Sequence, residues 1–268
     1  MIPGVELDHI SLAAFDRADL DRRYGGDLGA TYVTQGATAG LYATILRCDN
    51  GVKLETIEPH EADVIDYLVR FLERHGPGVH HLTFVVPDVG AAGRAAQAAG
   101  YRLVGSHTEH LVEVFLHPKD AHGVVVQFVE RRDYGPGGTP PEGWPVPSRP
   151  PADLDHLALV VGSLADARRL YVDLFGGQAD EVGALPELGG AADALDVRWT
   201  GPGCVRLVEA VAGSALDRWL AGRPGAVHHL AFTVEDPPGV PGARAAGDGR
   251  WEVPAEENFG VALHLRAR

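Results

Sequence analysis

The stretch VHHLTFVV, residues 79–86, decides the fold because it returns almost unchanged as VHHLAFTV at residues 227–234. A second motif is duplicated in the same way: LDHISL at 7–12 returns as LDHLAL at 154–159. The copies are separated by 148 residues in the first case and by 147 in the second. A repeat at a constant offset is the signature of a duplicated chain. We therefore expect two tandem halves of nearly equal length.

A segment rich in proline and glycine separates the two halves. Residues 134–151 read YGPGGTPPEGWPVPSRPP and show no hydrophobic period. Such a composition is typical of an extended, semi-rigid linker. The sequence therefore predicts a first domain over residues 1–133, a linker over 134–151 and a second domain over 152–268.

Each half contains a smaller repeat. His9 opens one apolar strand, and His81 opens another 72 residues later. A helical pattern follows each strand, at residues 16–29 and 89–100. The strands predicted after these helices are 42–48, 52–58, 111–117 and 123–130. The unit is therefore a strand, a helix and about three strands, repeated four times along the chain, and two units must pair to bury a sheet face.

Composition excludes several classes of protein. The 37 acidic and 23 basic residues leave a net charge of −14, which disfavours binding to nucleic acid or to an anionic membrane surface. No apolar run approaches the roughly 18 residues of a membrane helix. Two cysteines, Cys48 and Cys204, are too few for a disulfide framework. We expect a soluble cytoplasmic protein, a monomer or a homodimer, whose partner is a small molecule.

Four polar side chains interrupt the apolar strands of the first half at matching places in its two units. They are His9 with His81, and Glu55 with Gln127. Two imidazoles with one or two oxygen donors suit a divalent metal such as Zn, Fe, Mn, Co or Ni. Polar groups satisfied inside the core would explain any one of them, but their symmetric recurrence favours a metal site.

Together these motifs resemble the vicinal oxygen chelate superfamily, in particular its glyoxalase I and methylmalonyl-CoA epimerase branch. The pattern runs D-H-(I/L)-x-(L/I), a strand with Glu, H-H-(I/L)-x-F, and then the most specific piece, FLHPKDAHGVVVQFVE at 115–130. The resemblance covers nearly all of the first half and, more loosely, the second. It implies an α+β fold in which four βαβββ modules form two cupped, mixed-sheet domains.

The resemblance also implies a ligand set and a role for each member. It identifies His9, Glu55, His81 and Gln127 as the metal positions of the first half. The neighbouring His80 would face the other way and be structural. The epimerase branch usually has an amide at the second position and a carboxylate at the fourth, so the two types are exchanged here.

The exchange of Glu55 and Gln127 affects which residue could be the catalytic base. A ligand carboxylate in this family can double as the base in proton transfer, but the amide of Gln127 cannot. We therefore expect Glu55 or the nearby Glu113 to be the base, although Glu113 could equally be a solvated strand residue.

The second half departs further from the pattern. Its matching residues are His156, His229 and His264, while Val208 stands where a ligand is expected. Glu209, one residue on, would face the opposite side unless a bulge shifts it. Three histidines could hold a metal, and their placement resembles the facial triads of dioxygenases, whose third ligand is normally Glu. The alternative is a helper domain without metal.

Three classes of function follow from these observations. The first is a metal-dependent isomerase, epimerase or lyase that chelates a carbonyl or vicinal oxygens of a small organic substrate and stabilises an enolate-like intermediate. The second is a non-haem Fe(II) dioxygenase of the two-domain type. The third is a metal-free, drug-binding resistance protein, against which the two His-His pairs count. The sequence favours the first class.

Overall fold

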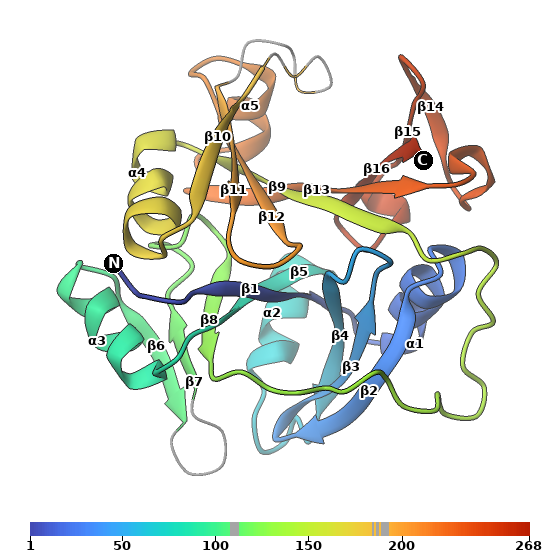
Figure 1. Ribbon diagram of the computed structural model, residues 1–268, viewed down its shortest axis with the longest axis horizontal. Coiled ribbons are helices and arrows are strands. Elements are labelled where there is room, and N and C mark those ends of the chain that lie inside the picture. Colours follow the sequence, from blue (N-terminus) through green and yellow to red (C-terminus); the bar gives the residue numbers. More distant parts are fainter. Residues whose placement is uncertain (108–112, 184, 186–187, 189–192) are drawn as a thin grey trace. The chain divides into compact units, whose positions relative to one another are not determined.

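The computed structural model describes residues 1–107, 113–183, 185, 188 and 193–268, and its strands form two mixed sheets (Figure 1). The strands of the first sheet are β1 (Glu6–Ala13), β2 (Thr31–Thr38), β3 (Gly40–Arg47), β4 (Lys53–His60), β5 (Gly78–Val85), β6 (Leu103–His107), β7 (Glu113–Leu116) and β8 (Val125–Val129). Those of the second are β9 (Asp153–Val161), β10 (Gln178–Val182), β11 (Ala194–Arg198), β12 (Cys204–Glu209), β13 (Gly225–Val234), β14 (Arg244–Gly247), β15 (Arg250–Val253) and β16 (Ala262–Ala267).

The two sheets have the same topology. The strand order is β2-β3-β4-β1-β5-β8-β7-β6 in the first and β10-β11-β12-β9-β13-β16-β15-β14 in the second. The first and last strands of a module pair in parallel, as β1 does with β4 and β5 with β8, whereas hairpin neighbours pair antiparallel. The predicted α+β fold of two mixed sheets, each built from two repeated strand modules, is confirmed.

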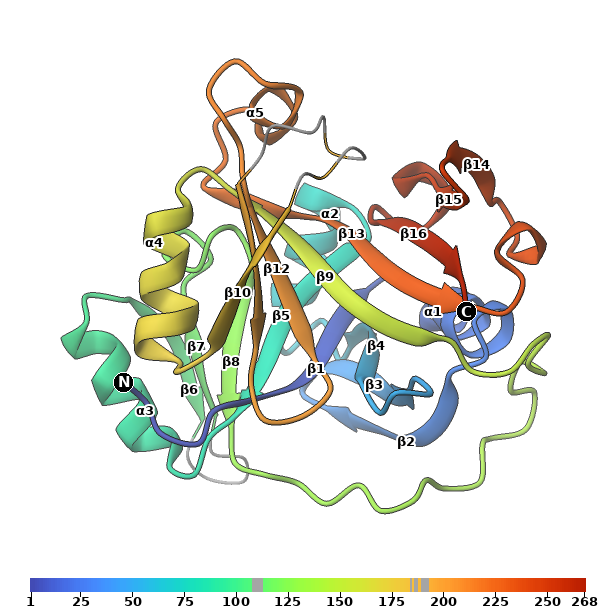
Figure 2. The ribbon, with the colours of Figure 1, turned by 45° about the horizontal axis from the view of Figure 1, so that its top comes forward.

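Short helices follow the first strand of three modules. They are α1 (Arg17–Asp21), which continues as a π-helical turn η1 (Arg22–Asp27), α3 (Val89–Ala98), and α4 (Leu164–Arg168), which continues as η2 (Arg169–Leu174). Each begins at a side chain that accepts a hydrogen bond from the first turn: Asp16, Asp88 and Ser163. Helix α3 packs on β7 and β8, and α4 on β12 (Figures 1 and 2). No helix in the described ranges is long and apolar enough to cross a membrane.

The fourth module departs from the expected repeat. In place of a helix it has a single 3-10 turn, η4 (Pro237–Gly239), and a second such turn, η5 (Ala255–Glu257), precedes its last strand. Pro237, Pro238 and Pro241 have no backbone N–H to donate, so an α-helix cannot extend through this segment.

Two further helices lie outside the repeat that the sequence predicted. Helix α2 (Tyr67–His75) packs Leu68 and Leu72 against Ala13 and Ile57. Ala13 of β1 is paired with Ile57 of β4 in the sheet. These two residues come two positions after Ser11 and Glu55, the polar pair of the same strands. Because side chains alternate along a strand, α2 covers the sheet face that carries those polar residues.

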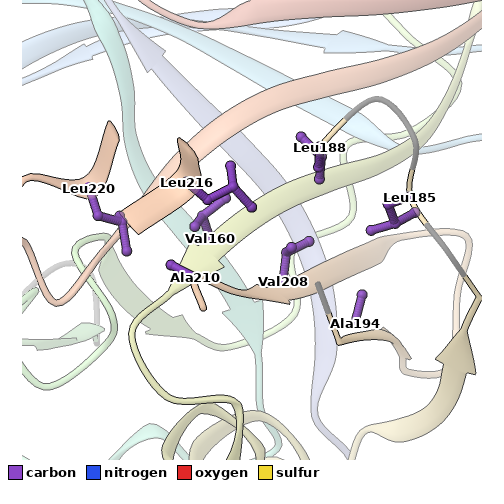
Figure 3. Packing of buried hydrophobic residues seen from close by; sticks show 8 residues of the cluster. All are labelled: Val160, Leu185, Leu188, Ala194, Val208, Ala210, Leu216 and Leu220. Atoms are coloured by element: carbon purple, nitrogen blue, oxygen red, sulfur yellow. The ribbon is translucent and has the colours of Figure 1, made fainter. Parts of the chain in front are cut away.

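Helix α5 (Ala215–Leu220) does the same for the second half (Figure 3). Its Leu216 and Leu220 belong to a buried cluster with Val160 of β9 and Val208 of β12. The remaining members of the cluster are Leu185, Leu188, Ala194 and Ala210. The face that carries His156 is therefore sealed at one end by aliphatic side chains.

The chain forms two compact units, and each combines parts of both halves. One unit contains residues 1–8, 81–132 and 156–228, and the other contains 9–80, 133–155 and 229–268. The domain boundaries at 134–151 remain a prediction from the sequence.

Aromatic side chains build the core of the first unit. Phe84 lies edge-on to Phe175 and Trp199, with ring centroids 5.1 and 5.0 Å apart, and Phe128 lies 5.2 Å from Phe175. In the second unit the ring of Tyr24 lies 6.4 Å from that of Phe232.

The linker is packed rather than free. Gly138 N–H donates to the carbonyl of Val33 at 2.8 Å, and Ser148 N–H donates to that of Gly26 at 2.9 Å. Trp144 lies edge-on to Tyr32, with centroids 5.0 Å apart. The proline-rich segment is therefore a surface strap of its own unit.

One backbone crossing gives a direct test of the packing. Gly123 has φ +87°, and a Cβ atom there would lie 1.8 Å from the carbonyl oxygen of Gly225. Gly76 has a similar φ, +74°, but no atom within 4 Å of such a Cβ. We expect Gly76→Ala to lower the free energy of unfolding by about 1–3 kcal/mol, because φ +74° with ψ −177° is a backbone region that essentially only glycine adopts. Gly123→Ala should lower it by more than about 4 kcal/mol because the crossing must open. Chemical denaturation of both variants measures this, and equal losses would show that the crossing is not tight.

Candidate metal centre

The structure brings three of the four predicted ligands of the first half together. His9 of β1, Glu55 of β4 and His81 of β5 each offer one ligand atom, and these atoms lie within 4.8 Å of one another. His9 Nε2 lies 3.5 Å from Glu55 Oε2. Two donors that bind one ion at about 2.1 Å in tetrahedral geometry are about 3.4 Å apart. This set of two buried imidazoles and a half-buried carboxylate therefore fits a divalent ion.

Parallel pairing explains why Glu55 stands beside His9. Ser11 of β1 is paired with Glu55 of β4, and His9 lies two residues before Ser11 on the same strand face. The hydroxyl of Ser11 donates a hydrogen bond of 2.6 Å to Glu55 Oε2. The carboxylate is thereby held against the strand that carries His9.

Gln127 is held in the same way on the partner module. Thr83 of β5 is paired with Gln127 of β8, and its hydroxyl donates to Gln127 Oε1 at 2.6 Å. The amide nitrogen of Gln127 donates to Glu113 Oε2, also at 2.6 Å. Since β8 lies between β5 and β7, the amide oxygen is turned toward the strand that carries His81. An amide binds a metal through this oxygen, because its nitrogen offers only donors.

Glu113 is buried with Gln127 rather than solvated. Its side chain lies in the protein interior, 9% exposed, and accepts the Gln127 hydrogen bond. Its part in catalysis remains a prediction.

His80 packs against helix α2, and the charge of Glu55 acts on its ring. Its ring lies edge-on to Phe71 of α2, with centroids 4.7 Å apart, and 6.0 Å from the ring of Tyr67. Burial lowers the pKa of His80 to about 4, so the ring is neutral at pH 7. It belongs to the packing between helix α2 and the sheet.

In the second half, the strand register corrects the expectation for Val208. Val208 is paired with Val160, and it is Arg206 that is paired with Ala158, two residues beyond His156. Arg206 therefore occupies the place that Glu55 has in the first half, and assigning that place to Val208 was wrong by two residues. The similar letters VKLET and VRLVE suggest a different alignment, but pairing with the neighbouring strand overrides it.

Glu209 also has a clear counterpart. It accepts a hydrogen bond from the backbone N–H of Leu164, at the start of α4. In the first half Glu58 accepts one from the backbone N–H of Arg17, at the start of α1. Glu209 is therefore a helix-terminus acceptor on the opposite strand face.

Arg206 is neutralised by a carboxylate on the next strand. Its Nε and Nη2 donate to the two oxygens of Asp196 at 2.7 and 3.0 Å, and Arg198 donates to Asp196 at 3.0 Å. Burial acts to raise the pKa of Asp196, but the hydrogen bonds and charges of the arginines outweigh it and lower the pKa. A cation thus stands where the first half has the carboxylate of Glu55.

The histidines of the second half are arranged differently from those of the first. His264 is paired with Ala231, as Gln127 is paired with Thr83, so it matches the fourth position as predicted. Within the described ranges, the group whose atoms could share an ion is His228, His229 and His264, without His156. The rings of His229 and His264 are stacked, with centroids 3.6 Å apart and planes 14° from parallel.

The stacking of His229 on His264 affects how well the two rings could bind one metal ion. An imidazole nitrogen donates its lone pair in the plane of the ring. Two nearly parallel rings therefore aim their lone pairs side by side rather than at one point. This geometry favours the first half as the metal centre.

Comparison with known proteins places the chain in a family. The family model of the Glyoxalase/Bleomycin resistance protein/Dioxygenase superfamily matches residues 8–113. The uncharacterized protein YqjC of Bacillus subtilis (strain 168) is 30% identical over 131 residues, which are 46% of this chain and 91% of that protein. The ethylmalonyl-CoA/methylmalonyl-CoA epimerase of Cereibacter sphaeroides is 30% identical over 134 residues, 46% of this chain and 95% of that enzyme. The chain belongs to this superfamily.

A solved structure extends the likeness of fold to both halves. A mutant of 4-hydroxymandelate synthase from Streptomyces coelicolor covers 100% of this chain and 94% of its own, with a TM-score of 0.64 and 18% sequence identity. The present chain thus shares its tandem fold with a protein of quite different sequence.

Metal content tests the ranking of the two halves. We expect His81→Ala to remove most of the metal bound by protein purified without chelator, because it deletes one of the converging donors. His229→Ala, the matched change in the second half, should remove less. Elemental analysis per folded chain measures both, with circular dichroism to check folding. The reverse ranking would make the second half the working centre.

Proposed function

We propose that the protein is a metal-dependent enzyme of the isomerase, epimerase or lyase type. It acts on a small organic substrate with a carbonyl or vicinal oxygens and removes a proton next to the carbonyl. The observation that carries the proposal is the convergence of His9, Glu55 and His81 within 4.8 Å. The epimerase named among the relatives supports the same class of reaction.

The chain's own residues would share the work as follows. His9, Glu55, His81 and Gln127 would hold a divalent ion of the Zn, Fe, Mn, Co or Ni type. Such an ion supplies a Lewis acid that polarises the substrate carbonyl and stabilises the charge left by proton loss. The aliphatic packing of α2 on the same sheet face would shield one end of the site from water.

Proton transfer needs a carboxylate, and Glu55 is our choice for the base. It is the carboxylate within the donor set, whereas Gln127 has no basic atom to offer. Glu113 is the second candidate, because it contacts the amide of Gln127.

Cysteine chemistry does not compete with this proposal. Cys48 and Cys204 are both buried, and burial raises the pKa of each thiol to about 12. Thiols in this state are poor nucleophiles at neutral pH. Buried, unpaired thiols and a net charge of −14 support a cytoplasmic protein that binds a small molecule and not nucleic acid.

The identity of the bound metal separates this proposal from the alternatives. Zn, Mn, Co or Ni, with no oxygen consumption, supports the isomerase, epimerase or lyase class. Fe with substrate-dependent oxygen consumption would support a dioxygenase. Protein that binds none of these ions would point to a metal-free binding protein.

The exchanged ligands give a sharper test. Glu55→Gln keeps the size of the side chain and should keep the fold and much of the metal, but it should lose roughly 10²–10⁴ in rate, the usual contribution of a general base. Gln127→Glu restores a carboxylate at the fourth position and should be tolerated. The measurement is solvent-deuterium exchange into candidate substrates, starting with acyl-CoA thioesters, alongside metal stoichiometry.

The outcome decides between the two carboxylates. Full exchange in Glu55→Gln would refute its assignment as the base. Glu113→Gln, tested in parallel, would then be expected to abolish exchange.

A further inference from the structure

We infer that Ser11 and Thr83 are positioning residues that aim the two oxygen ligands of the first half at the ion. The inference rests on the metal site proposed above. Neither hydroxyl would touch the substrate or the ion. Each would act through the ligand it contacts, Glu55 or Gln127.

The two contacts match in strand position, pairing and hydrogen-bond length. Ser11 and Thr83 each lie two residues beyond a histidine ligand on the same strand, and both are fully buried. Each is paired with the oxygen ligand of the neighbouring parallel strand, and each donates a hydrogen bond of 2.6 Å to it. The same arrangement thus recurs in both modules of the first half.

The second half provides an internal comparison. The residue at the place of Ser11 is Ala158, paired with Arg206, and the residue at the place of Thr83 is Ala231, paired with His264. Neither partner is an oxygen ligand. The hydroxyl is therefore present at both positions that face an oxygen ligand and absent from both that do not.

The physical reason lies in the freedom of the longer side chains. Glu and Gln lose several rotatable bonds when they are fixed, so an unsupported ligand oxygen would sample many positions. A buried O–H that donates to a carboxylate forms a short, strong bond, which fixes one oxygen of Glu55 on the His9 side.

For Gln127 the two ends of the amide are also distinguished. Of the two ends of the Gln127 amide, a carboxylate such as Glu113 can pair with the nitrogen, which donates, while the Thr83 hydroxyl donates to the oxygen. A flipped amide would set its oxygen against the Glu113 carboxylate. The pair thus keeps the metal-binding oxygen on the His81 side.

The test uses Co²⁺ as the probe on the full-length, metal-stripped protein. Ser11→Ala removes one buried hydroxyl, Thr83→Val removes the other while keeping the branched shape, and Thr83→Ser restores it. Ser11→Ala and Thr83→Val should each raise the Co²⁺ Kd by about 10–100-fold, while Thr83→Ser stays within about threefold of the unchanged protein. The visible Co²⁺ spectrum should shift in the two weakened variants, because an oxygen ligand has moved.

Thr233→Val is the matched control. Thr233 lies on β13 of the second half, where its hydroxyl donates to Asp155 at 2.8 Å and accepts from Arg266 Nε at 2.9 Å. Its loss should leave the Co²⁺ Kd and spectrum unchanged, although it costs two hydrogen bonds. Thermal unfolding of every variant shows that the weakened ones remain folded.

The outcomes separate the inference from the proposed function. Tight Co²⁺ binding by the unchanged protein with no effect of Ser11→Ala and Thr83→Val would overturn the positioning role and leave the metal site standing. Weak binding by Thr83→Ser would overturn it as well, by showing that shape rather than the hydroxyl matters. If the unchanged protein binds no Co²⁺, the proposed metal site falls, and the inference with it.

Discussion

Parallel pairing between the first and last strands of a module is the constraint on which the candidate site depends. In such a pair, opposed side chains lie on the same face of the sheet, so the strand that carries a histidine also decides which residue of its neighbour stands beside it. Ser11 opposite Glu55 and Thr83 opposite Gln127 are the result. A slip of one residue in either pair would turn the ligand to the other face of the sheet. The donor set is thus a property of register as much as of residue type.

The second half keeps this parallel pairing, but different residues stand at the paired positions. Arg206 stands in the place of Glu55, and Asp196, which binds it, is paired with Arg206 as Ile45 is paired with Glu55. Where the first half has Ile45 and Glu55, the second half has Asp196 and Arg206, and the opposite charges of these two side chains compensate each other. Within the same unit, the aliphatic cluster around Val160 seals the same sheet face (Figure 3). There an ion pair and apolar packing stabilise the fold.

Several elements could not be predicted from the sequence, each for a definite reason. Helices α2 and α5 are nine and six residues long, and so few turns carry little periodicity of their own; they are stabilised by packing on the sheet. The helix expected in the fourth module is replaced by a turn because of its prolines. Val208 was assigned to a ligand position because local similarity of letters does not report the register of β12.

The sequence by itself determined the duplication, the four modules and the positions of the histidines, because repeated motifs and a period of two are local properties of the chain. Only the tertiary structure decided which residue faces each histidine strand, that Glu113 holds the amide of Gln127, and that Arg206 stands in the place of a ligand. The contacts of Ser11 with Glu55 and of Thr83 with Gln127 each join residues 44 positions apart. Contacts at that separation are set by hydrogen-bonded pairing between strands, and no local pattern encodes the register of that pairing.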